Sequence, residues 1–327
     1  MERTTRSKAA GRTAVALLLA ILAAPVLAQS WPQRPVRMVV PFAPGGATDI
    51  IARVVSQRLG DGLGQQVVID NRPGAGTTLG TAQVARATPD GYTLLFAPTP
   101  FVIAPALYAA PGYDPLRDFA PVALLVISPF VLVVNAGTMP GSVGALVASA
   151  RAQPGRITFA SAGNGTVPHL AGELFRMHTG APLTHVPYKG GGPALLDLIS
   201  GQVHMMFATP IAVAPHLPGG RLRLLAATGQ SRLASYPDLP TLRESGWPDL
   251  EVQSFFGVVA PAGTPAPVIE RLGAALAAVT SDAEVRQKLS AQSADPRPLH
   301  AAAFGEFLAR ERERWKDVVA RSGARAD

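Results

Sequence analysis

Four segments of the chain share one pattern, in which a short apolar run leads into a glycine-containing turn and then into a helical period of apolar residues. They span residues 38–53, 67–80, 157–174 and 183–201. Apolar runs that alternate with helices in this way favour an α/β fold with parallel strands. In an open α/β sheet, the turns that follow the strands gather at one edge, where ligands bind. The recurrence therefore predicts a ligand site built from several of these turns.

The first of these turns has the chemistry of a small-anion site. Pro44, Gly45 and Gly46 follow the apolar run, and Thr48 and Asp49 open the helix. The glycines accept positive φ angles and let a ligand approach the backbone. Thr48 or Asp49 can accept hydrogen bonds from amides of the first helical turn. The remaining amides and the positive end of the helix dipole attract an anion, often a carboxylate.

Length and composition indicate a globular chain with two domains. The chain has 327 residues, of which 48% are hydrophobic and 16% are charged. This length supports two domains, each with an ample core. The sequence contains no cysteine, which excludes disulfides, cysteine–metal sites and thiol catalysis. No basic run is interleaved with aromatic residues, so the sequence gives no support for nucleic-acid binding.

The N-terminus has the three parts of a secretory signal peptide. Basic residues lie among positions 1–12, an apolar run covers 14–22, and the sequence VLA at 26–28, before Gln29, fits a cleavage site that ends in a small residue. The apolar run is shorter than the roughly 20 residues that span a membrane. We therefore expect residues 1–28 to be removed on export, with cleavage near Ala28. Because these residues carry four basic side chains and one acid, the exported chain keeps +4 of the total charge of +7.

The order of the predicted elements suggests a discontinuous first domain with a second domain inserted into it. The apolar run 122–135 is interrupted by Pro129, so it forms two strands or a strand that passes between the domains. The run 252–260 returns toward the first domain. We expect residues 29–134 and 254–327 to form the first domain and 135–253 the second. We also expect a helix at about 49–59 that ends near Gly60, and a polar loop at 97–100.

Seven motifs, taken in order along the chain, resemble the Bug/TctC family of periplasmic solute-binding receptors of tripartite tricarboxylate transporters. They are PFAPGGATDIIAR, NRPGAGTTLG, PDGYTLLFA, DFAPVALL, FASAGNGTVPHLAGELF, THVPYKGGGPALLDLISGQVHMMF and APAGTP. The resemblance implies a type II periplasmic-binding-protein fold, an α/β fold whose two lobes close on a small carboxylate. Such a ligand is a di- or tricarboxylate, an acidic amino acid or an aromatic acid. We expect a periplasmic monomer whose partners are this ligand and the membrane permease subunits of the transporter.

The same resemblance implies that backbone amides of the glycine loops, together with ordered water, hold the carboxylate. It points to three loops and to two threonines that follow buried strands and help to select the ligand. The implied ligand-binding positions are Pro44, Gly45, Gly46, Asp49, Thr99, Ser161, Gly163, Asn164, Gly165, Thr166, Tyr188, Lys189, Gly190, Gly191 and Thr209. Two positions depart from the family pattern: Thr166 stands where serine is frequent, and prolines at 98 and 100 stand where small hydroxyl residues are common.

Three of these residues have two interpretations each. Asp49 either contacts an amino group of the ligand or only stabilises the helix dipole, which is the commoner role of an acid in a first helical turn. Lys189 either pairs with a ligand carboxylate or is a solvated loop lysine. Tyr188 either stacks on the ligand or lines the wall of the cleft, and both roles keep its hydroxyl near water.

Other functional classes have weaker support in the residues. His169 and Glu173 lie four positions apart, as metal ligands sometimes do, but no HExxH pattern surrounds them. Ser161 with His169 suggests a serine hydrolase, yet Phe159 stands where the nucleophile elbow needs glycine. The loop at 74–76 lacks the third glycine of a dinucleotide fingerprint. We therefore expect no enzyme, metal or cofactor. The alternatives are an exported hydrolase and a receptor that serves a signalling partner instead of a permease.

Overall fold

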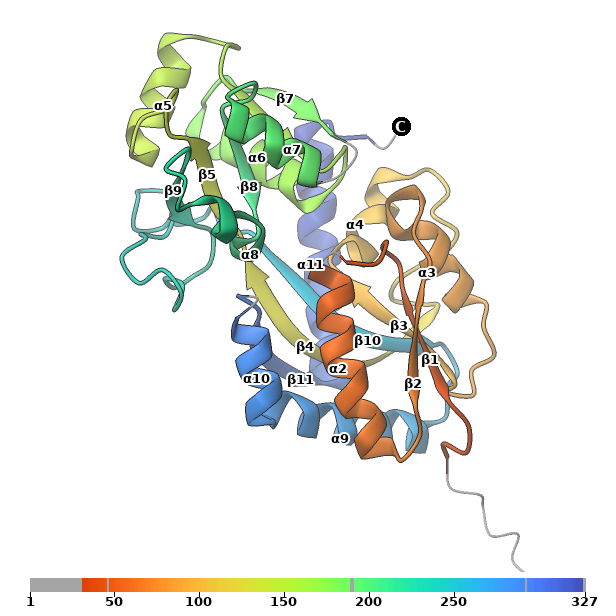
Figure 1. Ribbon diagram of the computed structural model, residues 1–327. Coiled ribbons are helices and arrows are strands. Elements are labelled where there is room, and N and C mark those ends of the chain that lie inside the picture. The colour runs from red at the N-terminus through yellow and green to blue at the C-terminus, as the bar shows by residue number, and fades with distance from the viewer. Residues whose placement is uncertain (1–30, 46, 189–190, 292, 326–327) are drawn as a thin grey trace, which may run out of the picture. The chain divides into compact units, whose positions relative to one another are not determined.

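The computed structural model describes residues 31–45, 47–188, 191–291 and 293–325. The signal peptide expected at 1–28 lies outside the described residues, and so do Gly46, Lys189 and Gly190. The chain divides into a short N-terminal unit, 1–33, and one compact unit from Arg34 to Asp327. This compact unit contains a six-stranded sheet and a five-stranded sheet (Figure 1).

The six-stranded sheet has the order β11-β4-β10-β3-β1-β2. Strands β1, β2 and β3 are parallel, whereas β10 is antiparallel to both β3 and β4, and β11 is antiparallel to β4. Strand β1 is buried at four of its five positions, as expected of a parallel strand with helices on both faces. The bounds are β1 Val36–Val40, β2 Val67–Asn71, β3 Thr93–Pro98, β4 Phe119–Pro129, β10 Gln253–Pro261 and β11 Asp295–His300.

The five-stranded sheet has the order β7-β6-β8-β5-β9. Strands β6, β7 and β8 are parallel, and β5 is antiparallel to β8 and β9. All four residues of β8 are buried, which matches its position in the middle of the sheet. The bounds are β5 Val131–Asn135, β6 Thr158–Ser161, β7 Thr184–Pro187, β8 Met205–Ala208 and β9 Leu222–Ala227.

The chain crosses between the two sheets at β4 and β5 and again just before β10. Strand β4 ends at Pro129, and β5 begins in the other sheet after the single residue Phe130. The buried hydroxyl of Thr228 joins the two crossings, because it accepts a hydrogen bond from the Phe130 amide at 2.8 Å and donates one to the carbonyl of Val252. The run 122–135 is therefore two strands, one in each sheet. The exact domain boundaries at 134/135 and 253/254 stay a prediction.

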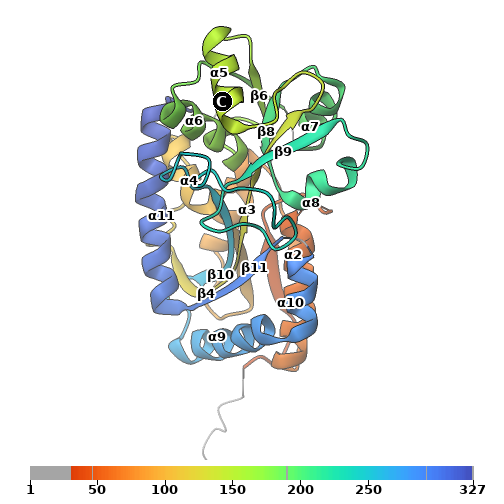
Figure 2. The same cartoon turned by 90° about the vertical axis from the view of Figure 1, so that its left-hand side faces the viewer.

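Helices cover both faces of the six-stranded sheet and form with it the six-stranded lobe. Figure 2 shows α11 and α4 on one side of this sheet and α2 and α10 on the other. Helices α2 and α9 contact each other, and α11 contacts β4, α4 and, on the other lobe, α6. The bounds are α2 Ala47–Leu63, α3 Thr78–Ala85, α4 Pro100–Leu107, α9 Ala266–Ser281, α10 Ala283–Ser290 and α11 Ala301–Ser322, with a 3-10 turn, η1, at Ala75–Thr77.

The five-stranded sheet and its helices form the five-stranded lobe. Helix α6 contacts β6, β7 and β8, and α7 contacts β5, β6 and β8. The hydroxyl of Ser142 accepts a hydrogen bond from the Ala145 amide at 3.3 Å and caps α5. The bounds are α5 Val143–Ala152, α6 Val167–Thr179, α7 Gly191–Ser200, α8 Pro210–Val213 and the 3-10 turn η2 Ala214–His216. None of the helices in the described ranges is both long and apolar enough to cross a membrane.

Two elements differ from the sequence predictions, and a third element was not predicted. Helix α2 continues through Gly60 to Leu63, because Gly60 leaves room for the backbone at 65–67 and the left-handed Gly64 (φ 70°) follows the end of the helix. The expected polar loop at 97–100 is instead the end of β3 and the start of α4, whose first residue is a proline, as helices tolerate. Strand β11 is an edge strand that contains prolines, which only an edge position permits.

Candidate functional site

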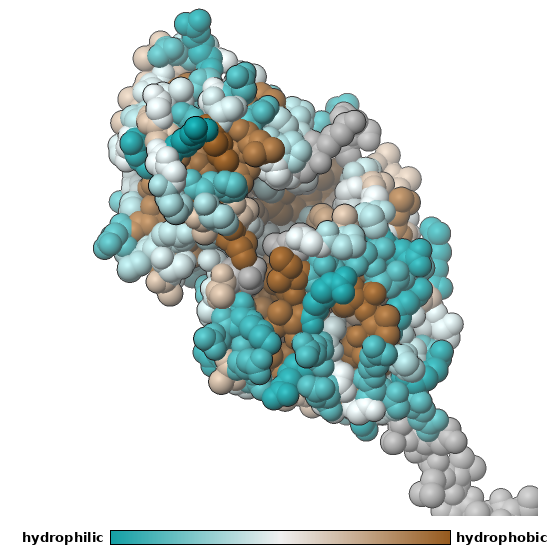
Figure 3. All heavy atoms as spheres, viewed as in Figure 1, coloured by the Kyte–Doolittle hydropathy of each residue, from teal (hydrophilic) through white to brown (hydrophobic). Residues whose placement is uncertain are grey.

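The described ligand-binding candidates follow the carboxyl ends of strands in both lobes. Those of the six-stranded lobe are Pro44, Gly45 and Asp49 after β1 and Thr99 after β3, and those of the five-stranded lobe are Ser161 to Thr166 at the end of β6, Tyr188 and Gly191 after β7, and Thr209 after β8. Figure 3 shows the surface hollowed between the N-terminal end of α2 and the region of α7 and α8. Exposed hydrophobic side chains, Ile50 and Leu196, lie on α2 and α7. Contact of these positions with a ligand stays a prediction.

The β1–α2 loop is held by the carboxylate of Asp49, which is only 3% exposed. Its Oδ2 accepts hydrogen bonds from the amide of Gly45 and from Nε of Arg53, both at 2.9 Å. Its Oδ1 accepts one from Nδ2 of Asn71 at 2.9 Å, and the same Nδ2 donates to the carbonyl of Phe42. Both oxygens of Asp49 are therefore engaged by the protein, which supports the structural interpretation of this residue.

The balance of forces on Asp49 keeps its carboxylate charged. Burial by itself raises the pKa of this group, but the hydrogen bonds from Arg53, Gly45 and Asn71 outweigh burial and lower the pKa below its usual value. Asn71 was not among the predicted site residues. Its position at the end of β2, beside the end of β1 in the parallel pair, brings it to the loop.

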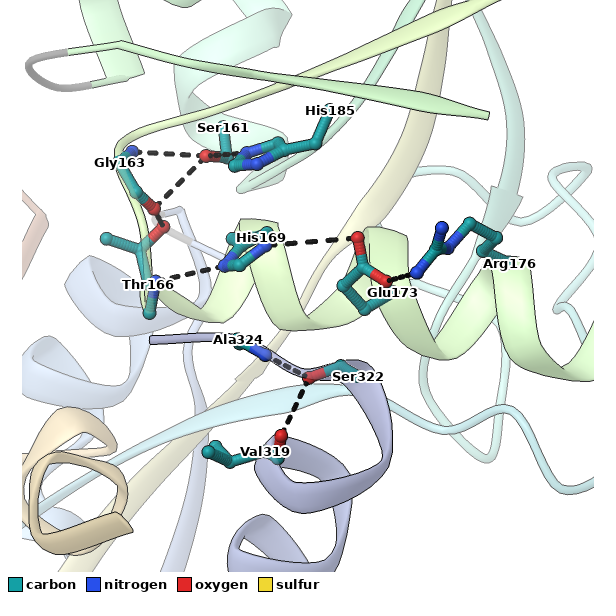
Figure 4. A network of polar contacts seen from close by, with 11 residues as sticks. Ser161, Gly163, Thr166, His169, Glu173, Arg176, His185, Val319, Ser322 and Ala324 are labelled. Carbon is teal, nitrogen blue, oxygen red and sulfur yellow. Dashed lines mark hydrogen bonds and ion pairs between the residues drawn. The ribbon is translucent and has the colours of Figure 1, made fainter. Parts of the chain in front are cut away.

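The β6–α6 loop, residues 162–166, is held by a second network of side chains (Figure 4). The hydroxyl of Ser161 lies 2.7 Å from Nε2 of His185 and accepts a hydrogen bond from the amide of Gly163 at 3.1 Å. The amide of Gly165 donates to Nδ1 of His169 at 3.0 Å. The hydroxyl of Thr166 donates to the carbonyl of Gly163 at 2.7 Å. Two glycine amides of this loop are thus bound by the protein's own acceptors.

Two stacked imidazoles contact this loop and the end of β6. The rings of His169 and His185 are 4.0 Å apart and nearly parallel, and Phe159 stacks on His185 at 4.8 Å. Burial lowers the pKa of His169 to about 4, with a contribution from Arg176, and burial together with His169 lowers the pKa of His185 to about 4. Both rings are therefore neutral at neutral pH. Because Nδ1 of His169 accepts from Gly165, its proton is on Nε2.

The pair Ser161 and His185 has the separation of a nucleophile and its general base. Ser161, however, is 0% exposed, and its Oγ also lies 3.1 Å from both the amide and the carbonyl of Gly163. Within the described ranges no carboxylate is hydrogen-bonded to His185. Glu173, the buried acid nearest to the imidazoles, pairs with Arg176 at 2.7 Å and lies 3.9 Å from His169. The geometry thus gives Ser161 a role in holding the loop.

The remaining ligand-binding candidates, Thr99, Tyr188 and Thr209, differ in the hydrogen bonds that their side chains make. The buried hydroxyl of Thr99 accepts a hydrogen bond from the amide of Phe255 at 2.8 Å, which ties the start of α4 to the crossing strand β10. The hydroxyl of Tyr188 donates to Asp197 on α7 at 2.7 Å, and burial and this carboxylate raise the pKa of Tyr188 to about 12. Thr209 precedes α8 but makes no side-chain cap there. The described residues contain no cluster of three or more potential metal ligands.

One narrow cavity is lined by residues of both lobes. The five-stranded lobe contributes the β6–α6 loop residues Asn164, Gly165 and Thr166. The six-stranded lobe contributes Phe42, two residues of η1 and five residues at α4, namely Gly76, Thr77, Pro100, Ile103, Ala104, Leu107 and Tyr108. The sequence predicted the first three of these eleven residues. It missed the five residues at α4 because α4 was not recognised as a helix, and it did not include Phe42, Gly76 or Thr77 among the ligand-binding positions.

The comparison with known proteins identifies the family. The model of the TctC family, described as "tripartite tricarboxylate transporter family receptor", matches residues 51–324. The chain belongs to this receptor family. It is 39% identical to protein BugT of Bordetella pertussis over 306 residues, 93% of this chain and 94% of BugT.

Solved structures of similar proteins agree with the TctC assignment. The periplasmic binding protein BugD is 35% identical with a TM-score of 0.80, over 90% of this chain and 99% of BugD. A protein of R. palustris solved with adipate is 36% identical with a TM-score of 0.83, over 90% of this chain and 99% of that one. The resemblance to the Bug/TctC family and the two-lobed α/β fold that it implies are confirmed. These TctC relatives are binding proteins rather than enzymes.

Proposed function

We propose that this TctC receptor captures a small carboxylate between its two lobes in the periplasm and delivers it to the membrane subunits of a tripartite transporter. The observation that carries the proposal is the cavity lined by loops of both lobes, together with the family match. The adipate held by the R. palustris relative is a carboxylate of the expected class. The net charge of +4 on the exported chain suits an anionic ligand.

The recognition that we infer differs in one respect from a cradle of glycine amides. The amides of Gly45, Gly163 and Gly165 already donate to Asp49, Ser161 and His169. These bonds fix the loops in front of α2 and α6. The first turn of a helix leaves backbone amides without partners and has a partial positive charge. We infer that the ligand carboxylate binds these first-turn amides of α2 and α6, directly or through ordered water.

Contacts to both lobes couple binding to closure. A ligand shifts a conformational equilibrium only by its difference in affinity for the two states. A carboxylate that touches α2 on one lobe and α6 on the other has its full set of contacts only when the lobes are closed, so binding favours the closed state. For capture at low concentration we expect a dissociation constant in the micromolar range or tighter, about −8 kcal/mol.

A hydrolase is the competing function, because the Ser161–His185 contact has the right length for one. The burial of Ser161 argues against it, since a nucleophile must reach its substrate. A receptor that serves a signalling protein instead of a permease would use the same ligand cleft. Ligand binding alone does not separate these two receptor roles, whereas pull-down of the permease subunits does.

A thermal-shift screen of residues 29–327 tests the proposal. The panel is a set of small carboxylates, each paired with its neutral amide. Ligand at 100-fold over its dissociation constant adds about 2.7 kcal/mol to the stability, which raises the melting temperature by a few degrees. We expect a shift with an acid and none with its amide. Shifts with the amides alone would contradict carboxylate recognition, and turnover of a carboxylic ester that is lost in Ser161→Ala would favour the hydrolase.

A further inference from the structure

The cavity between α4 and the β6–α6 loop has a mainly apolar wall. Ile103, Ala104 and Leu107 present aliphatic side chains from α4, and Phe42 and Pro100 add further apolar surface. The cavity's lining, all of it described, includes no lysine, arginine or histidine. A carboxylate placed there would have no counter-ion, and burying an unpaired charge is strongly unfavourable. The wall therefore suits the uncharged part of a ligand.

One lining residue, Thr77, has a buried hydroxyl without a partner. Its side chain is 3% exposed, and among the described residues no group is hydrogen-bonded to its Oγ1. A buried hydroxyl without a hydrogen bond is unfavourable, so such groups in native structures call for an explanation. Thr77 lines the cavity, and a rotation of its side chain about χ1 would turn the hydroxyl from its buried position toward a group bound there.

The backbone at Thr77 is strained as well. Its φ is 86°, and Ala75 and Gly76 before it also have positive φ angles. A left-handed conformation is unfavourable for a β-branched residue. Strain of this kind persists where the surrounding structure imposes it and is concentrated at functional sites. Here the 3-10 turn η1, which ends at Thr77, leads directly into α3, and the strain holds the Thr77 side chain at the cavity.

Close packing fixes the shape of the cavity from both lobes. A Cβ atom on Gly76 would lie 2.4 Å from the hydroxyl oxygen of Tyr108, and one on Gly165 would lie 2.3 Å from Cδ1 of Leu107. Both distances are below a normal contact, and the positive φ angles of Gly76 (58°) and Gly165 (73°) favour glycine at both positions. The end of α4 is thus held between η1 of one lobe and the β6–α6 loop of the other.

We propose that this cavity is a specificity subsite and that Thr77 is its hydrogen-bonding residue. The cavity takes the slender apolar body of an acid whose carboxylate is bound at the N-termini of α2 and α6. Thr77 binds one uncharged hydroxyl on that body. The class of ligand is a hydroxylated aliphatic acid rather than a compact tricarboxylate. This inference rests on the proposed function, because it assumes that a carboxylate binds in the same cleft.

The test compares acids that differ only in the hydroxyl. Butanoate, pentanoate and hexanoate, each with and without a terminal hydroxyl, are titrated into residues 29–327 by calorimetry, with citrate as the compact tricarboxylate. We expect at least one hydroxy acid to bind about fivefold to tenfold more tightly than its parent, which corresponds to one buried hydrogen bond. Thr77→Val, which keeps the β-branched shape, should abolish this preference and leave the parent acid's affinity unchanged.

Two further variants control for folding and for burial. Thr77→Ser keeps the hydroxyl and should keep the preference. Thr81→Val removes an equally buried hydroxyl from α3 that does not line the cavity, and it should also keep the preference.

The subsite inference is wrong, while the proposed function stands, if acids bind but the hydroxyl preference is absent or survives in Thr77→Val. The subsite inference is also wrong, while the proposed function stands, if only citrate binds. If no carboxylate binds at all, the proposed function fails with it.

Discussion

The β1–α2 loop and the β6–α6 loop use the same geometry with different chemistry. In each, a glycine amide donates to a side chain four residues later, Gly45 to Asp49 and Gly165 to His169. The first acceptor is an anion that Arg53 and Asn71 keep charged, and the second is a neutral imidazole stacked on His185. The acceptor for a glycine amide of the loop is thus a carboxylate in one lobe and a neutral imidazole, which can be protonated, in the other.

This difference gives the two loops different responses to pH. Protonation of His169 at Nδ1 would remove the acceptor of the Gly165 amide, because a charged imidazole donates from both nitrogens. The Asp49 carboxylate stays an acceptor to a lower pH, because its pKa is lowered below the ordinary value. The five-stranded lobe should therefore lose its loop structure first as the solution is acidified.

The largest expected effect is a loss of stability on acidification. The pKa values of His169 and His185 are about 4 in the folded chain and 6.5 in the unfolded chain. The unfolded state therefore binds more protons between these values, so the free energy of unfolding falls as the pH falls from about 6.5 to about 4. One pKa unit is worth about 1.4 kcal/mol, so each ring predicts a loss of about 3 to 4 kcal/mol and the two rings together a loss of up to about 7 kcal/mol, measured by urea denaturation across this range.

Among the neighbouring groups, His204 adds to the trend because burial lowers its pKa as well, whereas two carboxylates act against the trend or outside this window. The raised pKa of Glu173 favours the folded state at low pH and opposes the trend, and the lowered pKa of Asp49 acts only below its usual range. The double variant His169→Gln with His185→Gln should reduce the pH dependence to the part that His204 contributes, and the exposed His216→Gln should leave it unchanged. A pH dependence that survives undiminished in the double variant would contradict the assignment to the stacked pair.

The next largest effect is expected from Asp49→Ala. This change leaves the Gly45 amide and Nδ2 of Asn71 without their acceptor and Arg53 without its ion partner. Lost hydrogen bonds to a buried charged group predict a decrease of about 2 kcal/mol in the free energy of unfolding at neutral pH. The matched control is Glu284→Gln, which breaks the exposed pair with Lys288 and should change stability by less than about 0.5 kcal/mol. Equal effects of the two substitutions would show that Asp49 does not hold its loop.

The parts of the fold that the sequence predicts well are those with strong periodic patterns. The buried runs of β1 and β8, the helix that starts after the β6–α6 loop, and the break at Pro129 all have a physical signal within a few residues. Helix α4 has none, because PFVIAPAL is apolar on every side and contains two prolines. Its helical state depends on burial between the lobes, which only the tertiary structure provides.

The site is predictable at its loops but not at the groups that hold them. Asn71 meets Asp49 from 22 positions away, and His185 meets Ser161 from 24 positions away, both across neighbouring parallel strands. No local spacing indicates such pairs. Nor does the sequence indicate that the amides of Gly45 and Gly165 are already bound within the protein. A glycine-rich loop after a strand predicts where a ligand binds and leaves open which amides it uses.

The smallest expected effect concerns Thr166. Its hydroxyl donates to the carbonyl of Gly163 and closes the β6–α6 loop. Thr166→Val removes this bond and should lower the free energy of unfolding by about 1 kcal/mol, whereas Thr166→Ser keeps the hydroxyl and should be nearly neutral. Urea denaturation at pH 7 measures both. A loss in Thr166→Val as large as that in Asp49→Ala would mean that the β6–α6 loop depends on this one hydroxyl. The histidine acceptor would then be secondary, and the parallel between Asp49 and His169 would not hold.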